Sequence, residues 1–153
     1  MSPTDARAVR LLPAILVGLM LTPGSPARGQ TPDTAGPAVA AAQGTARAWL
    51  HLVDGGRYGE SWDSAATLVR HAVTRSGWDD AVRKARGPFE PLGGRALLSA
   101  SFQTRLPNAP PGQYVVLQYE TKGGGGKTVI EMVTPMKDED GRWRVAGYYI
   151  RPK

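Results

Sequence analysis

Residues 113–150 have the sequence QYVVLQYETKGGGGKTVIEMVTPMKDEDGRWRVAGYYI, and this stretch decides the fold. Apolar and polar side chains alternate with a period of two over residues 113–121, 128–136 and 142–150, which predicts three β-strands. The links at residues 123–126 and 138–141 are rich in glycine and aspartate, the residues that turns favour. Because such short links cannot cross a sheet, neighbouring strands should pair antiparallel.

A further strand and three helices are predicted upstream of this stretch. Residues 96–106 alternate like the later strands. Apolar residues recur every three or four positions over residues 38–54, 58–68 and about 74–87, as on one face of a helix. Thr74 or Ser76 is the candidate N-cap of the third helix. The expected fold class is α+β, with three N-terminal helices packed on one face of a four-stranded antiparallel meander sheet.

Folding the strands symmetrically about their turns predicts a register. The expected neighbours are Leu117 with Met132, Tyr119 with Ile130, Gln118 with Glu131, Met136 with Trp143, and Glu131 with Tyr148. The expected core face carries Val115, Leu117, Tyr119, Ile130, Met132, Met136, Trp143, Val145 and Tyr149. The other face would carry Val116, Gln118, Glu120, Val129, Glu131, Val133, Arg144, Ala146 and Tyr148.

The second of these faces is mixed in character, neither apolar enough for a core nor uniformly polar. Faces of this composition often contact a partner subunit. We therefore expect Gln118, Glu131 and Tyr148 to be the interface residues of any association, including a homodimer. Plain exposure of this face to solvent is the alternative.

The N-terminus has the organisation of a secretory signal peptide. Arg7 and Arg10 precede an apolar run at residues 11–21, and small residues follow at cleavage spacing. We expect a signal peptide at residues 1–29, a disordered tether at 30–37, and a single α+β domain at 38–153 that is periplasmic or secreted. An uncleaved anchor is the alternative, but the run is shorter than the roughly 20 residues of a bilayer span. No transmembrane span is expected after cleavage.

The composition excludes several classes of function. The chain has no cysteine, so disulfides, thiolate nucleophiles and thiolate metal sites are absent. Its formal charge of +6 is spread along the sequence, whereas a nucleic-acid binder concentrates such charge on one face. We expect no nucleic-acid partner and a solvated basic surface, with weak attraction to anionic lipid or cell-wall polymer as the alternative.

No complete catalytic or metal-binding pattern is present, so no catalytic residue, metal or cofactor is expected. His51 and His71 are the only histidines and lack ligand spacing, although a dyad of His71 with Asp63 or Glu60 is conceivable. Most aromatic residues are expected in the core. In the alternative, some line a semi-open pocket, and the ligand-binding residues would then be Trp62, Tyr119 and Tyr149.

Several motifs resemble one known family. The most specific are Ser61-Trp62-Asp63, Gly112-Gln113-Tyr114-Val115-Val116-Leu117-Gln118-Tyr119, Thr134-Pro135-Met136 and Asp140-Gly141-Arg142-Trp143-Arg144-Val145. Through them residues 49–150 resemble a bacterial family of exported proteins, domain of unknown function 4019. The family has no assigned activity, so the resemblance implies none for this chain. The order of helices before a sheet is also similar to the cystatin-like or nuclear-transport-factor-like roll, an analogy of fold that implies no function.

These observations favour an exported, non-catalytic binding or interaction module. Its partner would be an unknown protein or small molecule of the cell envelope. One alternative is a small roll-type enzyme that acts on a small apolar molecule in a cavity between helix and sheet. Another is a structural envelope protein held by its charge near an anionic polymer.

Overall fold

The fold is α+β, as predicted, with the helices preceding an antiparallel sheet. The computed structural model describes residues 35–153. The helices are α2 (Ala35–Asp54), α3 (Tyr58–Asp63), α4 (Thr67–Ala72), α5 (Arg75–Arg86) and the short 3-10 helices η1 (Gly87–Phe89) and η2 (Gly124–Gly126). The strands are β1 (Gly93–Gln103), β2 (Tyr114–Lys122), β3 (Thr128–Lys137) and β4 (Trp143–Pro152), in the order β1-β2-β3-β4.

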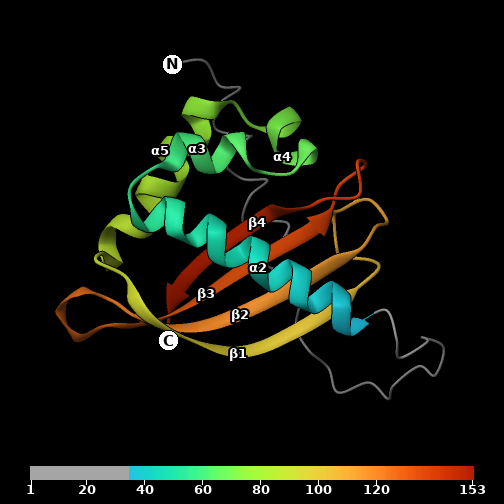
Figure 1. The fold of residues 1–153 in the computed structure, drawn as a ribbon. Helices are drawn as coiled ribbons and strands as arrows, with labels where there is room; N and C mark the ends of the chain where they lie inside the picture. The colour runs from blue at the N-terminus through green and yellow to red at the C-terminus, as the bar shows by residue number, and fades with distance from the viewer. Residues whose placement is uncertain (1–34) are drawn as a thin grey trace.

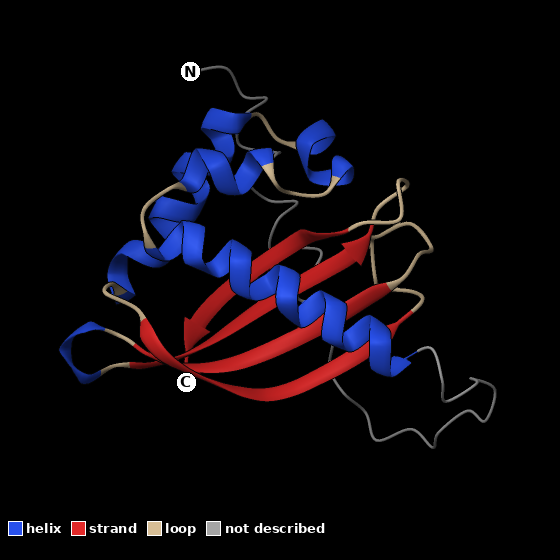
Figure 2. Cartoon of the chain, in the orientation of Figure 1, coloured by secondary structure: helices blue, strands red, loops and turns tan. Residues whose placement is uncertain are grey.

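Helix α2 is the element that covers the sheet. It runs diagonally across one face of all four strands, while α3, α4 and α5 gather on the β4 side beyond its C-terminal end (Figure 1; Figure 2). Its buried side chains, such as Ala42, Ala46, Trp49 and Val53, recur at three- and four-residue steps and so share one face. Of the predicted helices, therefore, only the first spans the sheet.

The second predicted helix, residues 58–68, is interrupted. The backbone of Ala66 is extended, and its N–H donates to the carbonyl of Val145 on β4 at 2.9 Å. This bond to the sheet takes the chain out of the helical conformation, so α3 ends at Asp63 and α4 begins at Thr67. The predicted cap of the third helix is confirmed, since Thr74 Oγ1 accepts from the N–H of Gly77 at 3.1 Å.

The first helix begins earlier than predicted, at Ala35 rather than residue 38. Residues 35–37 form the first turn of α2, where Pro37 is tolerated because helix-start N–H groups have no helical partner. The rest of the tether and the whole predicted signal peptide lie outside the described residues. Within residues 35–153, no helix is both long enough and apolar enough to cross a membrane.

The predicted register between β2 and β3 is wrong by one residue. Leu117 pairs with Val133 rather than Met132, and Tyr119 pairs with Glu131 rather than Ile130. The cause is the turn, which spans residues 123–127 and is closed by a bond from Gly123 N–H to the carbonyl of Lys127 at 2.9 Å. A slip of one residue moves every side chain of a strand to the other face.

The predicted register between β3 and β4 is also wrong. Met136 pairs with Arg144, and Glu131 pairs with Ile150. The turn here spans residues 138–142, and a further irregularity follows Thr134, where the next strand residue is Pro135. Because proline has no backbone N–H to donate, it is found at bulges in sheets, which fits the irregular pairing at Pro135.

These shifts exchange the two faces of β3. Val129, Glu131 and Val133 lie on the face that packs against the helices, whereas Ile130 and Met132 lie on the opposite face. The core prediction is therefore correct for Val115, Leu117, Tyr119 and Val145, which are buried in the core, and for Trp143, which packs against it. Met132, Met136 and Tyr149 lie instead on the opposite face of the sheet, and so does Ile130, although Ile130 is buried there.

Candidate functional site

The most unusual feature of the core is a group of ionised side chains between the helices and the sheet. It contains Asp54, Arg86, Arg95 and Glu131, which we call the ionic cluster. The side chain of Arg86 is 1% exposed and that of Glu131 is 0% exposed. Arginine and glutamate are almost never fully buried unless they are paired, so their environment requires an explanation.

Four separate elements bring these side chains together. Asp54 is the last residue of α2, and Arg86 is the last residue of α5. Arg95 lies near the start of the edge strand β1. Glu131 lies on β3, and the observed register directs it toward the helices and not toward solvent. The cluster therefore forms only when both helix ends dock on the sheet.

The carboxylate of Glu131 is saturated with hydrogen bonds. The hydroxyls of Tyr148 and Thr121 each donate to it at 2.6 Å. Arg95 donates from Nε at 2.6 Å and from Nη2 at 3.2 Å, and Arg86 donates from Nη1 at 3.3 Å. Both oxygens are occupied by donors of this chain.

Asp54 closes the cluster from the side of α2. It accepts from Arg86 Nη2 at 2.6 Å and from Arg95 Nη1 and Nη2 at 2.5 and 2.8 Å. Each arginine thus bridges the same two carboxylates, and the four charges sum to zero. Outside this ring, Glu90 accepts from Arg86 Nε at 3.1 Å.

The electrostatics favour the charged forms of Asp54 and Arg95. Burial alone would raise the pKa of Asp54, but the hydrogen bonds and charges of Arg95 and Arg86 outweigh it and hold that pKa below its ordinary value. Burial likewise opposes the charge on Arg95, yet its bonds to Asp54 and Glu131 raise its pKa. Burial, helped by the charge of Glu131, raises the pKa of Tyr148 well above the usual range, so its hydroxyl stays a donor.

Aromatic side chains form the wall next to the cluster. The ring of Trp49 lies 5.1 Å from that of Tyr148 and 6.2 Å from that of Trp78, centroid to centroid. Both indole N–H groups are satisfied by Ser61, which accepts from Trp49 at its carbonyl and from Trp78 at its hydroxyl. Both indole N–H groups thus donate to an acceptor within the chain.

This arrangement offers no free group for acid–base chemistry at the cluster. A general base must reach a substrate proton, but Glu131 is enclosed and both of its oxygens accept bonds from this chain. Among residues 35–153, no three His, Asp or Glu side chains group in a way that could hold a metal ion. His71 is exposed. The two carboxylates that could have formed a dyad with it accept hydrogen bonds from arginines instead: Asp63 from Arg75, and Glu60 from Arg57.

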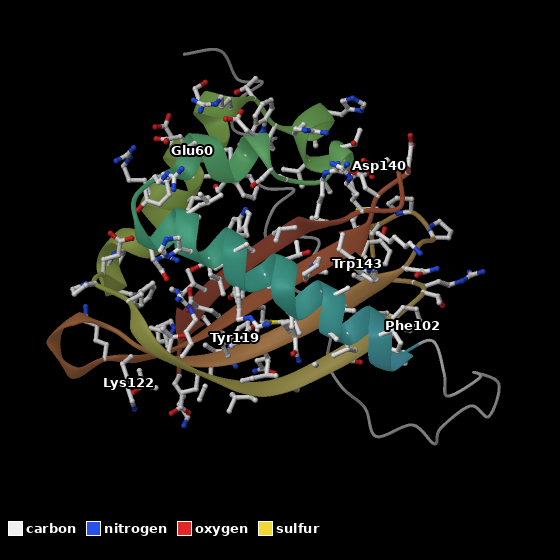
Figure 3. All side chains as sticks on the ribbon, in the orientation of Figure 1. Glu60, Phe102, Tyr119, Lys122, Asp140 and Trp143 are labelled. Carbon is white, nitrogen blue, oxygen red and sulfur yellow. The ribbon has the colours of Figure 1, made fainter. Side chains whose placement is uncertain are left out.

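The predicted ligand-binding residues are not brought together. The Trp62 indole donates to the carbonyl of Val73 at 2.9 Å in the helical part. Tyr119 lies buried on the sheet beneath α2 (Figure 3). Tyr149 pairs with Met132 on the opposite face of the sheet. A single pocket lined by these three side chains does not form.

The predicted interface residues are divided in the same way. Glu131 and Tyr148 are buried inside the chain, in and beside the ionic cluster, because the register is shifted. Gln118 lies on the opposite face, where its Oε1 is 3.5 Å from the hydroxyl of Ser99. The expectation that the three share one outward face is therefore wrong.

Of the four members of the cluster, only Glu131 is among the site residues predicted from the sequence. Arg86 stands in the basic run at residues 83–86, a pattern typical of a solvated surface, but it follows Trp78 and Val82 at four-residue steps and so continues the buried face of α5. That spacing was a usable signal. Asp54 directly precedes Gly55-Gly56, as turn residues often do, and Arg95 is one of many basic residues spread along the sequence, so neither carries a local signal of burial.

The comparisons with known proteins identify a family and little more. The family model described as protein of unknown function (DUF4019) matches residues 45–148. No curated protein matches the chain. A solved structure from Catenulispora acidiphila is similar, with 11% identity and a TM-score of 0.47, over 74% of this chain and 89% of that chain.

Proposed function

The chain belongs to the family of proteins of unknown function DUF4019, and from that premise we propose that it is an exported, non-catalytic binding or interaction module. The observation that carries the proposal is that the carboxylate of Glu131 is buried and fully hydrogen-bonded. Its carboxylate is 0% exposed and is held by Arg86, Arg95, Tyr148 and Thr121. An acid or base in this position would have to break those bonds before it reached a substrate.

The balance of charge supports the same proposal. Enzymes that tune a carboxylate for catalysis leave it with a perturbed pKa near the working pH. Here the two arginines favour the ionised form of Asp54 and lower its pKa. Such an arrangement stabilises charges that remain constant, as a structural ion-pair network does.

A small-molecule binding experiment separates this proposal from a roll-type enzyme. A panel of small apolar molecules is added to ¹⁵N-labelled protein, and the indole N–H signals of Trp49 and Trp78 are followed by NMR. Both indoles lie in the aromatic wall and bond Ser61, so a ligand at the cluster would shift them. We expect no saturable shift.

Matched variants sharpen this experiment. Glu131→Gln alters the cluster, whereas Glu60→Gln changes an exposed carboxylate on the outer surface of the helices (Figure 3). A compound that shifts both indoles in the wild type and in Glu60→Gln, but not in Glu131→Gln, would support the enzyme alternative and overturn the proposal.

Export rests on the sequence and has its own test. If residues 1–29 are a signal peptide, the mature chain recovered from the extracytoplasmic fraction begins between Arg28 and Gln30, as mass spectrometry would show. Leu16→Arg places a charge in the apolar run and is expected to keep the chain inside the cell. Recovery of the wild type only at full length in the membrane contradicts export.

A further inference from the structure

Helix α2 covers one face of the sheet, and no helix of residues 35–153 covers the other, which we call the outer face (Figure 1). Successive side chains of a strand point alternately to the two faces. Glu131 of β3 faces the helices. Met132, Thr134 and Met136 therefore lie on the outer face. Both methionines are partly exposed, whereas Thr134 between them is 1% exposed. The outer face of β3 thus presents two thioethers to solvent.

These two methionines hold all the sulfur of the described residues. The whole chain has four methionines and no cysteine, and the other two, Met1 and Met20, fall in the predicted signal peptide. The described core contains no methionine, although methionine is among the residues most often found fully buried. A reagent that attacks sulfur therefore meets the described part of the fold only at its outer face.

We propose that Met132 and Met136 form a site of reversible oxidation by peroxides, in which the hydroxyl of Thr134 binds the added oxygen. In the reaction, the sulfur donates an electron pair to one oxygen of hydrogen peroxide, so that an S–O bond forms and the O–O bond breaks. The departing hydroxide takes the proton of the transferred oxygen and leaves as water. The sulfur is oxidised to a sulfoxide and the peroxide is reduced, and methionine sulfoxide reductases reverse the change.

The environment of Thr134 supports this site. Its Oγ1 is the one side-chain polar atom of the described residues that is buried without a hydrogen-bond partner. A buried hydroxyl without a partner costs free energy. Residues two apart on one face of a strand lie about 6.6 Å apart, so a sulfoxide oxygen on Met132 or Met136 comes within reach of this hydroxyl. Oxidation thus supplies the acceptor that Thr134 lacks.

The change is confined to the outer face. Met132 pairs with Gln118 on β2 and with Tyr149 on β4. A sulfoxide is polar where a thioether is apolar, so oxidation makes the surface around these side chains more polar. The core on the other face contains neither methionine, so the fold should persist in both states. The inference goes beyond the proposed function, which assigns no modification to this chain.

Peptide mapping by mass spectrometry tests the site in the purified chain, because it reports each methionine separately. The control is Leu117→Met, a nearly volume-conserving change that puts another thioether at a 0% exposed position of the core. With hydrogen peroxide, Met132 and Met136 should each gain one oxygen at a rate within about tenfold of free methionine. The thioether introduced at position 117 should react more than about a hundredfold more slowly until urea unfolds the chain. The ratio of each rate in urea to that in buffer gives the same comparison for the wild type.

Urea unfolding tests the role of Thr134. Oxidised and reduced wild type should unfold at the same midpoint within experimental scatter, and methionine sulfoxide reductases should remove the added oxygen. Oxidation of Thr134→Val, which lacks the donor, should lower its midpoint. Oxidation of Thr128→Val, altered on the same face of β3 but farther from both methionines, should not.

Three results would each overturn the proposal. They are oxidation of Met132 and Met136 as slow as that at position 117, loss of cooperative unfolding in the oxidised wild type, and an equal effect of oxidation on the two threonine variants. The indole signals that test the proposed function report on the other face of the sheet, so the two proposals fail separately.

Discussion

Arg75 and Arg86 are the two ends of the same helix, and each binds an aspartate in very different surroundings. Arg75 donates to Asp63 from Nε and Nη2 at 3.0 Å each, and the two side chains are 55% and 51% exposed. Arg86 is 1% exposed and bonds Asp54 at 2.6 Å as well as Glu131 and Glu90. The residue types agree, but one pair lies in water and the other lies in the core.

The difference in burial indicates which ion pairs contribute most to the stability of the fold. When a surface pair is broken, water solvates each charge and little stability is lost. When a buried pair is broken, the remaining charge stays in a medium that cannot solvate it, which typically costs about 3–5 kcal/mol. The ionic cluster should therefore behave as part of the core, and the pair of Arg75 with Asp63 as part of the surface.

Removal of Arg86 is expected to have the largest effect. Arg86→Ala leaves Asp54 and Glu131 facing one arginine, and the free energy of unfolding should fall by about 3–5 kcal/mol in urea. Lys84→Ala, which removes an exposed cation from the same helix, is the control and should leave stability unchanged. Equal losses in the two variants would contradict the comparison.

Neutralising Glu131 is expected to have the next effect. The amide of Glu131→Gln can still accept from Tyr148 and Thr121, but it no longer balances the two arginines. We expect a loss of about 1.5–3 kcal/mol, the range for hydrogen bonds to charged groups. The same change at Glu120 on β2, whose carboxylate bonds Lys153 at the surface, should have a smaller effect in the same urea titration. A larger loss of stability at Glu120 than at Glu131 would contradict the conclusion that the buried carboxylate contributes more to the fold than the surface one.

Acid should act on the cluster through Asp54. Its pKa in the folded chain lies below the ordinary value of 3.8, so its contribution to stability is complete above about pH 4 and is lost as the pH falls through the folded pKa. Stability measured from pH 5 to pH 2.5 should therefore fall less steeply in Asp54→Asn than in the wild type.

Salt distinguishes the two pairs in that experiment. The pKa of Asp63 is also lowered, by its bond to Arg75, but this exposed pair is screened at 1 M salt. The difference between wild type and Asp54→Asn should survive 1 M NaCl, whereas that between wild type and Asp63→Asn should disappear. Loss of both differences in salt would mean that the cluster is hydrated.

The smallest effect is expected at the surface pair. Arg75→Ala should leave the urea midpoint within the experimental scatter, because both partners are solvated when apart. The helix cap at Thr74 stays in place and provides the internal check, since the bond from Gly77 N–H should persist in amide exchange. A large loss of stability would show that exposure does not decide the role of an ion pair here.

The local parts of the fold could be predicted from the sequence, and the register could not. Alternation and turn residues specify the four strands and their order, since these features lie within a few residues of one another. The register depends on whether Lys127 and Arg142 belong to a turn or a strand, and their side chains do not reveal it. That one-residue ambiguity placed Glu131 on the wrong face.

The candidate site shows the same limit. The burial of Arg86 could have been predicted, because it continues the spacing of Trp78 and Val82 along α5. Asp54 and Arg95 could not, since they meet only after α2 and β1 have docked on the sheet. A member of such a cluster can be recognised from the sequence only where it occupies a position on an otherwise apolar face, as Arg86 does on α5.

The central claim is that the carboxylate of Glu131 is committed to the fold, and a double-mutant cycle tests it most directly. Arg95 and Glu131 form two hydrogen bonds, at 2.6 and 3.2 Å. Urea unfolding of Arg95→Ala, Glu131→Ala and the double variant should give a coupling of about 1–3 kcal/mol, with the double variant less unstable than the sum of the singles. The equivalent cycle on Arg75 and Asp63 should give no resolvable coupling. If the losses of Arg95→Ala and Glu131→Ala add within about 0.5 kcal/mol, the two groups act independently and the account of the cluster is wrong.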